Sequence, residues 1–170
     1  MKIVKYLIYK GRIFLYLIAS LITWLLLNIV FEFQMVNKWI QIIIILLFFL
    51  IIRVIDDYTD YDKDKKNRKQ YLSKQELIIF LIFLCLACII LNIIDYGIQG
   101  FFIIPVLVFT IIGFKYEYLK LFISSIFLLE YVILQGNHWN FKTDVAMIVC
   151  IMFEVIFDKY KGRKNDNLHK

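Results

Sequence analysis

The stretch IQIIIILLFFLIIRVIDDYTDYDKDKKNR, residues 40–68, joins one of the most apolar runs of the chain to its densest group of charges. Five of the fourteen acidic residues lie at positions 56 to 64, and seven lysines and arginines lie between 53 and 74. The apolar part predicts a membrane-spanning helix, and the charges indicate where that helix leaves the hydrocarbon.

The composition of the whole chain supports a membrane setting. Of the 170 residues, 62% are hydrophobic and 20% are charged, and the mean hydropathy is +0.75. Soluble domains are usually about 45–50% apolar. We therefore expect an all-α fold, a polytopic membrane helix bundle that forms a single integral membrane domain over residues 1–170. The net charge of +6 then favours cytoplasmic loops facing anionic lipid over a nucleic-acid partner.

Apolar segments recur along the chain and suggest about six transmembrane helices. The segments are 13–31, 39–55, 77–94, 98–114, 119–135 and 144–157. A spanning helix needs about 20 residues, so the last three segments must extend into their flanks. The start MKIVKYLIYKGR has no small-residue cleavage site after its apolar run, and we expect it to be retained rather than removed as a signal peptide.

The basic residues predict the orientation of these helices. Eighteen of the twenty lysines and arginines fall before the first segment, or after the second, fourth and sixth. Only Lys38 and Lys142 fall in the other connections. The positive-inside rule therefore predicts cytoplasmic termini, a cytoplasmic Asp-rich loop at 56–75 and a basic cytoplasmic tail at 159–170.

The acidic residues after the second apolar segment follow a helical spacing. If the helix continues through residue 64, four aspartates and Arg53 fall within an arc of about 100°, whereas Asp62 points away. The four are Asp56, Asp57, Asp60 and Asp64. Four carboxylates on one face repel each other, and a hard cation removes that repulsion. Because Mg²⁺ binds carboxylates together with water and phosphate oxygens, this face is a candidate metal site.

Nearby basic residues suggest a phosphate ligand. Arg53, Lys63 and Arg68 are close enough in sequence to contact the remaining charge of a diphosphate bound through Mg²⁺. The alternative is a solvated loop of mixed charge, in which aspartate–lysine pairs serve only solubility.

The segment DDYTDYDKD, residues 56–64, resembles the first Asp-rich motif of the UbiA-type prenyltransferases, (N/D)-D-x-x-D-x-x-x-D. Asp56, Asp57, Asp60 and Asp64 take its four places. The preceding Arg53 and the following Lys-Asn-Arg are similar to a bacterial branch of that superfamily. The resemblance implies an all-helical enzyme of the bacterial cytoplasmic membrane that uses Mg²⁺ to bind an isoprenoid diphosphate. It also implies transfer of the prenyl group to an acceptor, which the sequence does not identify.

A second acidic motif is expected of this family, and FEVIFDKYKGRKND, residues 153–166, occupies the corresponding place. Glu154 and Asp158, one helical turn apart, form a possible second acidic site. A frayed helix end with a basic tail explains them equally well. Family members usually have nine spans, so we expect a homo-oligomer or a membrane partner to complete the fold. The rival function is a non-catalytic membrane protein that binds a lipid or a partner and retains half of such a site.

Other polar or reactive residues give weaker signals. Cys85 and Cys88 form a C-x-x-C within an apolar segment, where cysteines mostly pack as small hydrophobic residues. Glu130 lies inside the fifth segment, where a carboxylate is either functional or paired near an interface. His138 and His169 are isolated and predict no metal site.

Overall fold

The computed structural model describes residues 2–10, 12–31, 38–64 and 71–115. Every element in these ranges is a helix, so the all-α prediction is confirmed for the part of the chain that the structure describes. The fifth and sixth predicted spans and the basic tail at 159–170 lie outside the described residues.

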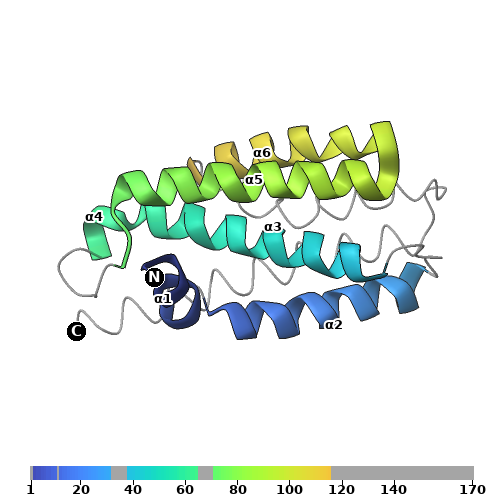
Figure 1. The fold of residues 1–170 in the computed structure, drawn as a ribbon, viewed down its shortest axis with the longest axis horizontal. Coiled ribbons are helices and arrows are strands. Elements are labelled where there is room, and N and C mark those ends of the chain that lie inside the picture. The colour runs from blue at the N-terminus through green and yellow to red at the C-terminus, as the bar shows by residue number, and fades with distance from the viewer. Residues whose placement is uncertain (1, 11, 32–37, 65–70, 116–170) are drawn as a thin grey trace.

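The elements follow one another as short and long helices. In chain order they are α1 (Lys2–Lys5), the π-helix η1 (Tyr6–Lys10), α2 (Ile13–Phe31), α3 (Lys38–Thr59), α4 (Tyr61–Asp64), α5 (Lys74–Tyr96), the 3₁₀-helix η2 (Gly97–Phe102) and α6 (Ile103–Lys115). Figure 1 shows α2, α3, α5 and α6 running alternately in opposite directions. The helix α3 contacts α2, α5 and α6, so it is the centre of the described bundle.

The core is formed by one face of each long helix. From α3 it takes Ile44, Ile45, Phe48, Ile51 and Val54, all fully buried. From α5 it takes residues spaced three or four apart, namely Leu77, Phe80, Leu84 and Cys88. The opposite face of α5 is also apolar, and there Ile79 and Phe83 are 68% and 64% exposed. A helix that is apolar on all sides is typical of a membrane span.

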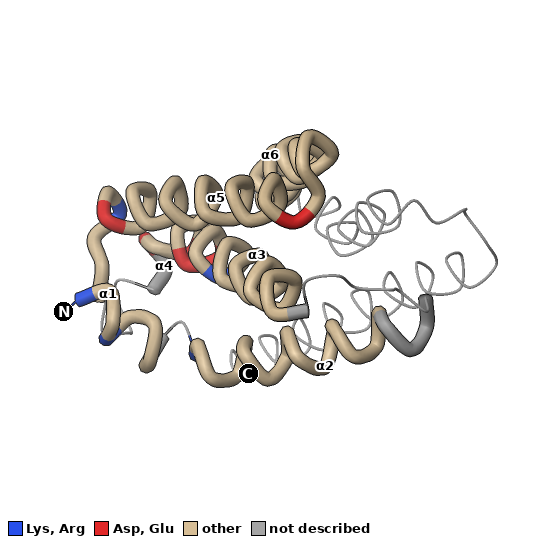
Figure 2. Tube along the Cα trace, turned by 45° about the vertical axis from the view of Figure 1, so that its right-hand side comes forward, with Lys and Arg blue, Asp and Glu red and all other residues tan. Residues whose placement is uncertain are grey.

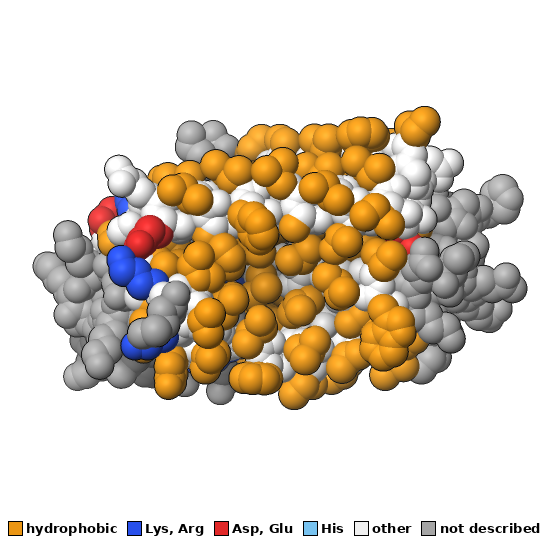
Figure 3. Space-filling model, in the orientation of Figure 1, with side chains coloured by type: hydrophobic (Ala, Val, Ile, Leu, Met, Phe, Trp, Pro, Cys, Tyr) orange, Lys and Arg blue, Asp and Glu red, His pale blue; other side chains and the backbone are white. Residues whose placement is uncertain are grey.

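The long helices have the dimensions that a bilayer requires. By length and composition, Trp39–Thr59 and the helical stretch Lys74–Phe114 can each cross a membrane. A third candidate is Lys2–Tyr9 together with Ile13–Leu27, two helices that meet at a bend of 59°. Figure 3 shows hydrophobic side chains along the length of the bundle, with most of the charged ones near one end. These features are those of an integral membrane protein, while the total of six spans stays a prediction.

The stretch Lys74–Phe114 is a hairpin, in which η2 turns the chain back so that α6 returns beside α5 (Figure 1). Gly97 permits the turn because its φ of 61° is unfavourable for other residues. Gly100 lies against the preceding helix, and a Cβ there would be 2.3 Å from the Asn92 carbonyl oxygen. The fourth predicted segment, 98–114, is therefore a tight turn followed by a short helix, and not one straight helix.

Charged residues gather at the end of the bundle where α3 ends and α5 begins (Figure 2). The helix α5 starts with a capping box, in which the Glu76 amide donates to the Ser73 hydroxyl at 3.2 Å and the Ser73 amide donates to the Glu76 carboxylate at 2.7 Å. Among the residues whose side chains the structure describes, one charged residue lies away from this end. It is Asp95, near the C-terminal end of α5.

Candidate functional site

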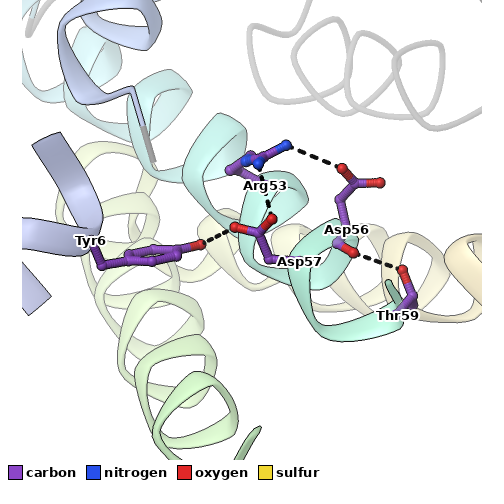
Figure 4. Close-up of polar contacts among 5 residues, drawn as sticks. All are labelled: Tyr6, Arg53, Asp56, Asp57 and Thr59. Carbon is purple, nitrogen blue, oxygen red and sulfur yellow. Dashed lines mark hydrogen bonds and ion pairs between the residues drawn. The ribbon is translucent and has the colours of Figure 1, made fainter. Parts of the chain in front are cut away.

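The candidate site is built around Arg53, which bridges two carboxylates in the last turns of α3 (Figure 4). Its Nη1 atom lies 3.2 Å from Asp56 Oδ2, and its Nη2 atom lies 2.9 Å from Asp57 Oδ1. These are i,i+3 and i,i+4 pairs, which share one face of a helix. The predicted proximity of Arg53 to the first two aspartates is therefore seen in the structure, as a direct ion-paired cluster.

Asp57 is the most enclosed member of this cluster. Its side chain is 3% exposed, and its second oxygen accepts a 2.8 Å hydrogen bond from the Tyr6 hydroxyl. Tyr6 itself is 1% exposed and comes from η1, near the start of the chain (Figure 4). Both oxygens of Asp57 are thus engaged, as a buried carboxylate requires.

Tyr6 lies in η1, before α2 and outside α3 and α5. Its hydroxyl reaches Asp57 from this separate element and acts as a donor to the carboxylate (Figure 4).

The acidic helix does not run straight to residue 64. The helix α3 ends at Thr59, Asp60 forms a turn, and α4 adds a single turn from Tyr61 to Asp64. At the break, the Thr59 hydroxyl donates to the Asp56 carbonyl oxygen at 2.9 Å, in competition with the helical pattern. The amide of Asp60 still donates to the same carbonyl at 3.0 Å. The common face therefore holds for the first part of the motif only.

Lys74, at the start of α5, contacts residues on both sides of this break. Its Nζ atom lies 3.2 Å from Asp62 Oδ2. It also lies over the rings of Tyr58 and Tyr61, at 5.2 and 5.9 Å from their centroids. Asp62 is 78% exposed, so it lies apart from the buried Asp57, which agrees with its predicted direction away from the acidic face.

Other predicted site residues fall beyond what the structure describes. The side chains of Lys63 and Asp64 are not described, although the backbone of both belongs to α4. Arg68, Glu154 and Asp158 lie in ranges outside the described residues. The diphosphate-binding role of the two basic residues and the second acidic site therefore stay predictions.

A pocket of about 290 Å³ lies between α3, α5 and α6, close to the charged end. Its lining residues are almost wholly apolar, and they are Ile55, Tyr58, Thr59, Leu77, Ile78, Leu81 and Ile111. At 100° per residue the α3 members lie on the side of that helix opposite Arg53 and Asp57. The pocket has the character of a site for a hydrocarbon chain, and it is separate from the carboxylate cluster.

The arrangement of the described carboxylates determines whether they could bind Mg²⁺. Within residues 2–10, 12–31, 38–64 and 71–115, no three His, Cys, Asp or Glu side chains converge as metal ligands. Mg²⁺ is often held by only one or two carboxylates, with water and substrate phosphate completing the shell. Asp56, with 24% of its side chain exposed, and the half-buried Asp60, one turn further on, fit that requirement. Asp57 does not fit while both of its oxygens are engaged.

Two residues of this site could not be predicted from the sequence alone. Tyr6 is 51 residues away from Asp57, and no local pattern connects the two. Lys74 could have been suspected only from its place at the start of a helix that follows the acidic segment. Cys85 is half-buried and Cys88 is fully buried, as expected for packing residues.

No family model, curated protein or solved structure matches this chain. The resemblance to UbiA-type prenyltransferases therefore rests on the motif in residues 53–68.

Proposed function

We propose that this chain is a prenyltransferase-like membrane protein that binds a Mg²⁺-isoprenoid diphosphate and transfers the prenyl group to an acceptor. The observation that carries the proposal is the group of Arg53, Asp56 and Asp57 in the last turns of a membrane-length helix, where the bundle becomes charged. A carboxylate and guanidinium group at a membrane boundary suits an amphiphile with an anionic head and an apolar tail.

In this proposal Asp56, Asp57, Asp60 and Asp64 hold Mg²⁺. Asp57 takes part only after Arg53 or Tyr6, which together engage both of its oxygens, has released it. Bound Mg²⁺ would neutralise the diphosphate and stabilise it as a leaving group. Arg53, together with Lys63 and Arg68, supplies positive charge for the remaining phosphate oxygens.

The surroundings of the site also enter the proposal. The apolar interior of the bundle excludes water from a reactive allylic group. In this proposal the acidic segment and both termini lie on the cytoplasmic side of a bacterial membrane, an orientation that the positive-inside rule favours. A second copy of the chain or a membrane partner completes the chamber, with Glu154 and Asp158 as the second acidic group.

Binding of a geranyl diphosphate analogue in the presence of Mg²⁺ tests this proposal. We expect Asp60→Asn to weaken Mg²⁺-dependent binding by roughly tenfold or more, because it removes a metal ligand. Asp62→Asn is the matched control, since Asp62 is exposed and pairs with Lys74. Equal losses in the two variants would indicate a diffuse electrostatic effect and reject the site.

A non-catalytic role is the second candidate, and the ion-paired cluster itself favours it. Arg53 forms an ion pair with each of Asp56 and Asp57 within the chain, so both carboxylates have a cationic partner without a metal. In that case the protein binds a lipid or a partner and retains only half of an enzyme-like site. Diphosphate release from a prenyl diphosphate and an acceptor mixture separates the two, because only the enzyme turns over.

A further inference from the structure

The N-terminal helix, α1 with η1, covers the candidate site through a buried contact. The Tyr6 hydroxyl donates to Asp57 Oδ2, and the Tyr6 ring packs edge-on against Phe80 of α5, at 6.1 Å between centroids and 85° between planes. Tyr6 therefore joins the N-terminal helix to both α3 and α5.

Two further contacts fasten the same helix at the charged end. Lys2 Nζ lies 3.0 Å from Glu76 Oε1, and the Tyr9 ring stacks on Tyr71 with 6.0 Å between centroids. The Lys2 side chain is 72% exposed and Tyr9 is 68% exposed, so these contacts are open to solvent or lipid headgroups and contribute little. Tyr6 is thus the principal anchor of the N-terminal helix.

The arrangement at Asp57 leads to a competition. One oxygen is held by Arg53 at 2.9 Å and the other by Tyr6 at 2.8 Å, and the side chain is 3% exposed. Asp57 can reach a cation only if one of these contacts opens and the carboxylate becomes accessible. Arg53 lies on the same helix and stays nearby, whereas Tyr6 lies on a separate element and can be withdrawn.

The N-terminal helix is joined to α2 through a break in the helical path. Arg12 precedes α2 with a φ of 48°, so the helical path is interrupted between η1 and α2. The axes of Lys2–Tyr9 and Ile13–Leu27 differ by 59°. The N-terminal helix is thus a unit with an axis of its own, distinct from that of α2.

We propose that Tyr6 is a positioning residue that closes the site: docking of the N-terminal helix on Asp57 and coordination of Mg²⁺-diphosphate by Asp57 exclude each other. This inference rests on the proposed function, because it concerns the same ligand. Because the two events compete, a change that weakens docking strengthens ligand binding by up to the same factor.

The test measures binding of Mg²⁺ with inorganic pyrophosphate to the full chain in mild detergent. Tyr6→Phe keeps the ring against Phe80 and removes only the hydrogen bond to Asp57. Because a hydrogen bond to a buried charge is lost, we expect the variant to bind roughly tenfold more tightly or better. Tyr9→Phe is the control, since Tyr9 stacks at the surface, and its affinity should equal that of the unmodified chain.

A second measurement does not depend on any variant. Hydrogen exchange of residues 2–10 in the unmodified chain should accelerate when Mg²⁺ and pyrophosphate are added, since the helix is released. Equal affinities of Tyr6→Phe and the unmodified chain, with exchange unchanged by ligand, would overturn the inference and leave the proposed function standing. Absence of binding in both chains would overturn the proposed function and the inference together.

Discussion

At the scale of single residues, Asp57 illustrates what a sequence can and cannot reveal. Its pairing with Arg53 follows from a spacing of four residues, which places both on one face of any helix. Its bond to Tyr6 crosses 51 residues, and only the packing of η1 against α3 creates it. The sequence therefore predicts the charges of the cluster, but not the burial that changes Asp57 from an available ligand into an enclosed ion pair.

This burial makes Arg53 important for stability. We expect Arg53→Gln to lower the free energy of unfolding by about 3 kcal/mol, because Asp57 would remain buried without its cation. Asp62→Asn breaks the exposed pair with Lys74 and should cost less than about 1 kcal/mol. Unfolding titrations in detergent measure both values. A cost for Arg53→Gln as small as that for the control would mean that water reaches Asp57.

At the scale of elements, apolar runs predict the helices better than they predict the helix ends. The predicted segment 13–31 coincides with α2. The segment 77–94 is extended to Lys74–Tyr96 because the capping box and the glycine turn set the ends of α5. The acidic helix instead breaks at Asp60, where Thr59 and Lys74 offer contacts that helical periodicity does not contain.

The capping box offers a test at this scale. Ser73→Ala removes the acceptor for the Glu76 amide and should destabilise the protein by about 1 kcal/mol, with faster hydrogen exchange in the first turn of α5. Gln75→Ala, at an exposed position within the same turn, serves as the control and should change little. Unchanged exchange in Ser73→Ala would show that packing alone fixes the start of α5.

At the scale of the whole molecule, the uneven distribution of lysines and arginines along the sequence predicts that charges lie at one end of the bundle. The counted basic clusters flank alternate apolar segments, and alternating helices bring such clusters to one end. Among the described side chains, the charges do gather at the end of α3 and the start of α5 (Figure 2). Hydropathy separates the segments 77–94 and 98–114 and so predicts a reversal between them, but it could not predict that the turn η2 extends to Phe102 and shortens α6. The contact of Gly100 with the Asn92 carbonyl is a matter of distance and not of polarity.

The orientation of the bundle in the membrane follows from the same asymmetry and can be measured. In a chain without native cysteines, Ile98→Cys should react with an impermeant thiol reagent added outside intact cells, whereas Asp62→Cys should not. Both positions are well exposed, at 86% for Ile98 and 78% for Asp62, so accessibility within the fold does not bias the comparison. Labelling of position 62 from outside would reject cytoplasmic placement of the acidic segment.

The long-range bond between Tyr6 and Asp57 also has a consequence for biosynthesis. Tyr6 leaves the ribosome 51 residues before Asp57, so their bond cannot form during that interval. The bond forms only when α2 and α3 have been inserted as an antiparallel pair, with the start of one beside the end of the other. An inverted α3 would carry Asp57 to the opposite leaflet, far from Tyr6. The contact therefore distinguishes correctly inserted nascent chains from inverted ones before synthesis is complete.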